Sequence, residues 1–209
     1  MILSILSSCT STKKMYEKDV SNQMAKQNIE TRSITKADME NLPVPVAKYL
    51  EHCGWIGKDI PRNFFFRFDG RFSLKPGKEM RVKSEQYNWL KHSPARLFYM
   101  KNPMISGYHC YNENGASMLI KLLGRIKVAY ADGPEMDQAE LVTFLNDMCL
   151  FAPGALVDAP ISWKSIDSHT VKATISQYGY KISATLFFNE KYELVNFISN
   201  DRYATTSNG

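Results

Sequence analysis

The sequence predicts an α+β protein built on a curved antiparallel sheet, at most an incomplete barrel, with helices packed on one face. Apolar and polar residues alternate over 63–74 and again over 180–188, the pattern of half-buried strands. Short turns join most expected strands, and one long helical segment interrupts them. The 209 residues suffice for one domain with a sizeable core.

Three helices are expected. Thr35 and Asp38 form a capping-box pattern that predicts a short helix. In "LPVPVAKYLEHCG", Pro45 suits a first helical turn and Gly54 a C-terminal stop, which predicts a second. The clearest helix is residues 134–150, where apolar residues recur at helical spacing.

The remaining elements read as strands. Residues 116–132 form either a strand pair or a strand and a short helix, broken at Gly124. The other strands are expected over residues 63–74, 79–90, 95–100, 107–112, 160–166, 169–177, 180–188 and 192–199.

The first nine residues resemble the end of a bacterial lipoprotein signal peptide. Leu6-Ser7-Ser8-Cys9 fits the lipobox, in which small residues let a transferase reach the thiol. A complete signal also has a basic region and a longer apolar region, so either the true start lies upstream or the fit is chance. We expect residues 1–9 to be the remnant of a signal peptide and Cys9 to carry the lipid.

The lipobox predicts how the chain is organised and where the protein is located. Residues 10–34 are polar, which favours a solvated tether. A single domain is expected over 35–203, and a polar, truncated or divergent tail over 204–209. A lipid anchor would place the protein in the bacterial cell envelope, on the outer membrane or the outer face of the inner membrane.

Three phenylalanines on the first strand form a candidate ligand site. Phe64, Phe66 and Phe68 lie two residues apart, so they share one face of the strand. Helix 134–150 offers a cover for them through Leu141, Leu145 and Met148. If that packing is complete, these residues are core; if a space separates helix from sheet, they line a cavity for a lipid or another hydrophobic ligand.

The start of the long helix carries a second, polar candidate site. Glu135, Asp137, Gln138 and Glu140 crowd its first turns. Carboxylates at positions 137 and 140 can share one helical face, where they could bind a cation or serve in acid–base chemistry. Acidic residues at a helix N-terminus also simply complement the helix dipole.

Other function classes lack support in the sequence. The net charge of +5 is spread along the chain, without the basic patch that nucleic-acid binding needs. Known catalytic, metal and cofactor motifs are absent, and Ser106, His109 and Cys110 sit on a strand that would point the last two to opposite faces. The cysteines at 53, 110 and 149 are expected to be buried free thiols, with a Cys53–Cys149 disulfide as the alternative.

Three segments carry a family resemblance. "LPVPVAKYLEHCG", "MLIKLLGRIKVAYADGPEMDQAEL" and "ISWKSID" are similar to a family of uncharacterised bacterial proteins, DUF6544 (DUF6920-like), over about residues 35–203. The resemblance implies no activity. Members usually continue past "DRY" with further strands, which implies a shortened or divergent end here. A lipobox, a tether and a curved sheet with helices are also similar in architecture to envelope lipoprotein carriers.

The sequence therefore leaves three functions open. The first is a non-catalytic, membrane-anchored module that binds a lipid or other hydrophobic molecule. The second is a hydrolase that uses the acidic residues at 135–140. The third is an interaction scaffold in the envelope.

Overall fold

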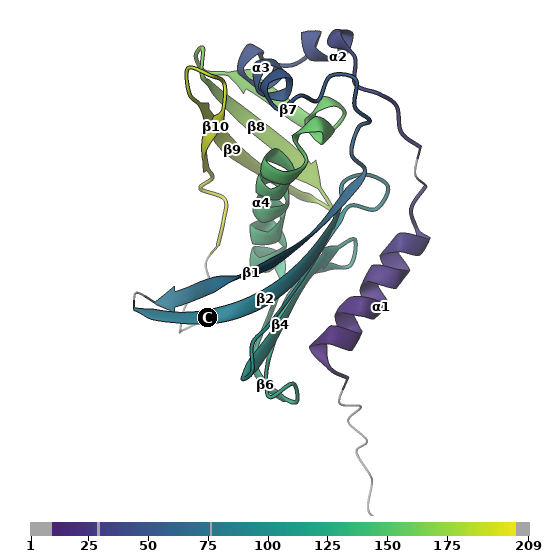
Figure 1. Cartoon of the computed structure of the whole chain (residues 1–209), viewed down its shortest axis with the longest axis vertical. Coiled ribbons are helices and arrows are strands. Elements are labelled where there is room, and N and C mark those ends of the chain that lie inside the picture. Colours follow the sequence, from purple (N-terminus) through teal and green to yellow (C-terminus); the bar gives the residue numbers. More distant parts are fainter. Residues whose placement is uncertain (1–9, 29, 76, 204–209) are drawn as a thin grey trace, which may run out of the picture.

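The computed structural model describes residues 10–28, 30–75 and 77–203, and its strands form two antiparallel sheets (Figure 1). The larger sheet contains six strands in chain order, each hydrogen-bonded to the next. These strands are β1 (Asn63–Lys75), β2 (Lys78–Trp89), β3 (Ala95–Lys101), β4 (Ile105–Asn112), β5 (Gly115–Leu122) and β6 (Ile126–Asp132).

The smaller sheet has the strand order β10-β9-β8-β7. Its strands are β7 (Ile161–Ser165), β8 (Thr170–Gln177), β9 (Tyr180–Phe188) and β10 (Leu194–Ile198). The predicted α+β class and the open, curved sheet are confirmed, and residues 116–132 are a strand pair. The expected strands are divided between two sheets because the long helix separates β6 from β7 in the chain.

Helix α4 (Pro134–Phe151) packs between the two sheets. Its fully buried Leu141, Phe144, Leu145 and Met148 join residues of β8 and β9 in the main hydrophobic core. A 3-10 turn, η1 (Pro153–Val157), follows directly and is largely buried. The apolar segment that the sequence places in a loop is therefore part of this core.

Two short helices share a small cluster of their own, and the second also packs into the main core through Val46 and Tyr49. These are α2 (Lys36–Glu40) and α3 (Val44–His52), as the capping box and the proline-to-glycine spacing predict. Ile34, Met39, Leu50 and Ile60 form a small buried cluster beneath them.

The N-terminal segment differs from the predicted tether. Residues Thr12–Ala25 form helix α1, which packs on the face of the larger sheet opposite α4 (Figure 1). Tyr16 is 2% exposed and lies against Tyr99 and Tyr108. The Tyr108 hydroxyl donates to Asp19 at 2.7 Å. Helices therefore cover both faces of this sheet, not one, and the expected solvated tether is wrong for residues 12–25.

Candidate functional site

A half-exposed cluster of phenylalanines lies where β1 passes the end of α4. The Phe66 ring centroid lies 5.8 Å from that of Phe64, 4.7 Å from Phe68 and 4.6 Å from Phe151, the last residue of α4. Phe68 is 51% exposed and Phe151 is 43% exposed. We call Phe64, Phe66, Phe68 and Phe151 the phenylalanine cluster.

The expected cover for these rings is only partly present. Leu141, Leu145 and Met148 are buried in the main core, and Phe64 packs against that core. Phe66 and Phe68 lie further along β1, where their aromatic contact from α4 is Phe151. The three predicted rings therefore share one face, as expected, but Phe68 is mostly open to solvent.

The apolar face of β1 continues across the larger sheet. In antiparallel pairs, directly opposite residues point to the same face, so the register extends this face from Phe66 and Phe68 to the neighbouring strands. The residues that share it include Phe72, Met80, Val82, Phe98, Met118 and Ile120. Most of these are partly exposed. We call this surface, with the phenylalanine cluster, the open face.

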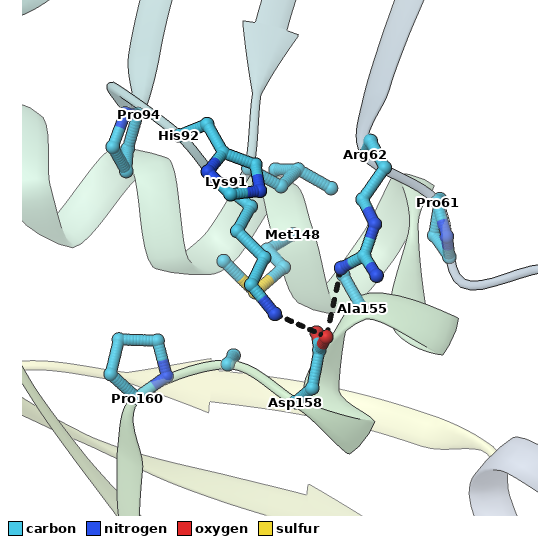
Figure 2. Close-up of a pocket in the computed structure, with 11 residues that line it drawn as sticks. Pro61, Arg62, Lys91, His92, Pro94, Met148, Ala155, Asp158 and Pro160 are labelled. Atoms are coloured by element: carbon cyan, nitrogen blue, oxygen red, sulfur yellow. Dashed lines mark hydrogen bonds and ion pairs between the residues drawn. The ribbon is translucent and has the colours of Figure 1, made fainter. Parts of the chain in front are cut away.

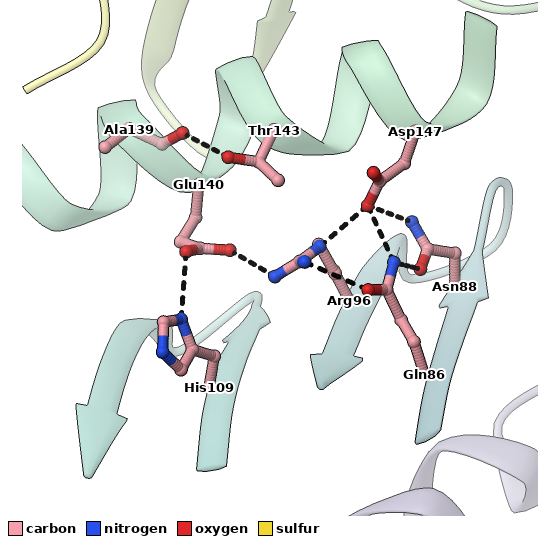
Figure 3. Close-up of polar contacts among 8 residues, drawn as sticks. All are labelled: Gln86, Asn88, Arg96, His109, Ala139, Glu140, Thr143 and Asp147. Atoms are coloured by element: carbon pink, nitrogen blue, oxygen red, sulfur yellow. Dashed lines mark hydrogen bonds and ion pairs between the residues drawn. The ribbon is translucent and has the colours of Figure 1, made fainter. Parts of the chain in front are cut away.

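A buried ionic network borders the open face under α4 (Figure 3). The Arg96 guanidinium donates to Glu140 at 2.9 Å, to Asp147 at 2.7 Å and to Gln86 at 3.0 Å. Gln86 also donates to Asp147 at 2.7 Å. Arg96 is 8% exposed, and both carboxylates are buried as well. The network fixes α4 on the larger sheet through buried polar contacts.

The network holds two carboxylates against one arginine. Gln86 also donates to Asn88 at 2.7 Å, and His109 Nδ1 lies 3.4 Å from Glu140 Oε1. Burial raises the pKa of Glu140, but Arg96 and His109 outweigh it and hold that pKa at about 2. Glu140 therefore stays ionised at neutral pH. Phe98 stacks edge-on against His109 and lies under the Arg96 guanidinium, which joins the network to the open face.

The four polar residues predicted as a site do not converge. Glu135 is exposed. Asp137 accepts hydrogen bonds from the Ala116 amide and, at 2.8 Å, from the Tyr180 hydroxyl. Gln138 donates to the Asp201 carbonyl at 2.8 Å, whereas Glu140 points to the opposite sheet. Asp137 thus fastens α4 to both sheets, Gln138 fastens it to the C-terminal segment, and Glu140 fastens it to the larger sheet.

A separate pocket of about 260 Å³ lies beside the β2–β3 turn (Figure 2). Its wall is mainly apolar, with Met148 at its base, and Asp158 stands at one side. Lys91 donates to the Asp158 carboxylate at 2.7 Å and Arg62 at 2.8 Å. Burial raises the pKa of Asp158, but these two cations lower it by more. Both cations donate to the same carboxylate oxygen, Oδ2, so Asp158 is held in an ion pair with the protein.

The structure bears out several expectations about reactive groups. Cys53, Cys110 and Cys149 are free, as expected, but only Cys149 is buried and the other two are partly exposed. Burial raises the pKa of Cys110 to about 11 and of Cys149 to about 12, so both thiols stay protonated. His109 faces α4, whereas Cys110 packs with the cluster under α1. Cys9 lies outside the described residues.

The described residues hold neither a metal-binding cluster nor a membrane-spanning helix. They contain no group of three or more histidine, cysteine or acidic side chains placed to hold a metal ion. In the same part of the chain, no helix is long and apolar enough to cross a membrane.

Sequence reasoning missed the residues at the centre of the network, which are Arg96, Asp147, Gln86 and Asn88. Two sequence signals point to this network. Glu140 and Asp147 are seven residues apart and so share one face of the helix. Gln86 and Asn88 are polar residues on the face of β2 that carries Met80 and Val82.

The fold and these sites define an open, two-sheet α+β domain with an ion network under its central helix and an exposed aromatic face. The chain belongs to the DUF6544 family, a family of unknown function, whose model matches residues 32–209. No curated protein and no solved structure matches this chain.

Proposed function

We propose that this protein is a non-catalytic module that binds a long acyl chain of a lipid or fatty acid on the open face. The observation that carries the proposal is the phenylalanine cluster, because Phe68 and Phe151 remain about half exposed while contacting each other and Phe66. Exposed aromatic surface of this kind costs free energy in water and is typical of binding sites.

The dimensions of the open face favour an extended apolar chain. A strand rises about 3.3 Å per residue, so Phe64 to Phe72 covers about 26 Å. One leaflet of a bilayer has an acyl thickness of about 15 Å, half of the hydrocarbon core. On the hairpin of β1 and β2, the charged residues Asp69 and Arg81 pair on the opposite face. The open face is therefore long and free of this charge, and its polar members opposite Phe68 and Phe66, Ser84 and Gln86, are buried.

The geometry favours binding over hydrolysis. A hydrolase that used the 135–140 segment would need its carboxylates to meet in one polar cleft. Here Asp137 accepts from Ala116 and Tyr180, whereas Glu140 is paired with Arg96, so the two carboxylates are engaged by separate donors. Both carboxylates serve to hold α4 in place.

Replacing Phe66 and Phe68 together by serine is expected to weaken binding of a dansyl-labelled undecanoic acid at least tenfold, since two apolar contacts of about 1.5 kcal/mol or more are lost. Fluorescence titration measures the change. Phe65→Ser is the matched control, because Phe65 is a partly exposed neighbour on the other face that packs on Tyr87 at 4.4 Å. Equal losses in both variants, or saturable binding in neither, would contradict the proposal.

We also propose that Cys9 carries a lipid anchor that holds the protein in the bacterial envelope. The support is the lipobox sequence and the short distance along the chain from Cys9 to helix α1. With its natural gene start, the wild-type protein is expected to incorporate an alkyne-tagged fatty acid, and Cys9→Ala to incorporate none. Equal labelling of wild type and Cys9→Ala, or no labelling of either, would contradict the proposed lipid anchor.

A further inference from the structure

Two turns at one end of the larger sheet expose a compact apolar surface. The amide of Leu123, in the β5–β6 turn, donates to the carbonyl of Met104, in the β3–β4 turn, at 2.7 Å. Met104 is 58% exposed, Leu123 is 61% exposed and Ile126 is 60% exposed. We call these three residues the apolar tip.

The backbone at Leu123 shows that the local turn does not require this residue. Leu123 has φ of 49° and Gly124 has φ of 70°, and the Arg125 amide donates to the Leu122 carbonyl. These features define a hairpin turn in which asparagine is the favoured first residue. Leucine is strained at positive φ.

The β8–β9 turn offers an internal comparison. Tyr178 also has positive φ, 52°, before a glycine. Its ring, however, packs on Tyr111, and its hydroxyl donates to the Pro94 carbonyl at 2.8 Å. Packing therefore accounts for the residue at 178. At Leu123 the side chain is mostly exposed, so intramolecular packing does not account for it.

The surroundings of the apolar tip are basic. Residues 115–131 contain Lys121, Arg125 and Lys127 and no acidic residue. Lys121 Nζ donates to the Thr10 carbonyl at 2.7 Å, which brings the start of α1 to this end of the sheet. Figure 1 shows α1 beginning at the same end as the β5–β6 turn. A basic rim around exposed apolar side chains complements an anionic lipid surface.

We propose that the apolar tip inserts into the interface of an anionic phospholipid bilayer. This contact goes beyond the acyl-chain site, because it uses other residues and requires no lipid anchor. The apolar side chains enter the boundary between headgroups and acyl chains, while the basic residues meet the phosphates. Thr10, the first described residue, lies beside Lys121 at this end of the sheet.

The test uses the full chain carrying Cys9→Ser, which prevents acylation, and co-sedimentation with vesicles. The chain is expected to bind vesicles of phosphatidylcholine and phosphatidylglycerol at 7:3, and to bind pure phosphatidylcholine more weakly. Leu123→Asn should lower the affinity for the anionic vesicles at least tenfold, while its thermal midpoint stays equal or rises because asparagine suits the turn. Lys127→Glu should lower the affinity for the anionic vesicles more than fivefold, since each basic residue near an anionic membrane contributes about 1 kcal/mol, or about fivefold in affinity.

Val44→Asn is the matched control, because Val44 is 62% exposed at the start of α3. It should bind vesicles like the parent chain. Unchanged vesicle binding by Leu123→Asn, or no binding by the parent chain, would overturn the proposal. A change in self-association of Leu123→Asn in the absence of vesicles would also overturn it, because the apolar tip would then be a contact between copies of the chain. None of these results affects the fatty-acid titration, which depends on Phe66 and Phe68.

Discussion

Replacing Arg96 by methionine is expected to lower the free energy of unfolding by about 3–5 kcal/mol, the usual cost of removing one partner from a buried charge pair. Arg96 is the sole cation that contacts both Glu140 and Asp147 in the described structure, and all three side chains are buried. Methionine keeps much of the side-chain volume, so the lost free energy of unfolding measures the cost of leaving Glu140 and Asp147 without Arg96. Urea denaturation followed by circular dichroism measures it.

Arg81→Met is the control for the Arg96 variant. Arg81 pairs with Asp69 through two hydrogen bonds, but its side chain is 78% exposed. Such surface pairs contribute about 0–1 kcal/mol. If Arg96→Met cost no more than Arg81→Met, the network would not be holding α4 on the larger sheet.

Tyr16→Ala is expected to cost about 3–4 kcal/mol, because it removes a buried aromatic ring from the packing of α1. Tyr16 contacts Tyr99 and Tyr108 from the second turn of the helix. Chemical denaturation gives the stability, and limited proteolysis should show new cleavage within residues 12–28 as α1 detaches.

Tyr16→Phe separates the ring from its hydroxyl. The hydroxyl is buried and has no hydrogen-bond partner among the described residues, so its removal should change stability by less than about 1 kcal/mol. A loss below about 1 kcal/mol for Tyr16→Ala as well, with no new cleavage, would mean that α1 contributes little and that the segment behaves as a tether.

The sequence predicted the elements whose pattern is local. Alternation in β1 and β9, the capping box at Thr35 and the apolar stripe of α4 each specify an element without its neighbours, and the structure confirms them. The shared face of Phe64, Phe66 and Phe68 follows from strand geometry in the same way.

The missed features depend on contacts between distant segments. Thr12, Tyr16 and Gln23 form the buried stripe of α1, and two of the three are polar, so a composition-based reading describes the segment as a tether. Thr12 donates to Ser106, 94 residues away. Arg96 and Glu140 are 44 residues apart. Each residue alone has the polarity of a surface position, and only the packed sheet shows that they are buried.

Photo-cross-linking tests directly whether an acyl chain lies on the open face. The full-length protein is irradiated with a diazirine-bearing palmitic acid, and the labelled peptides are mapped by mass spectrometry. We expect saturable labelling of β1 around Phe66 and Phe68 and of the α4 end at Phe151, with competition by unlabelled palmitic acid. Saturable labelling confined to other segments, or none that palmitic acid displaces, would contradict it.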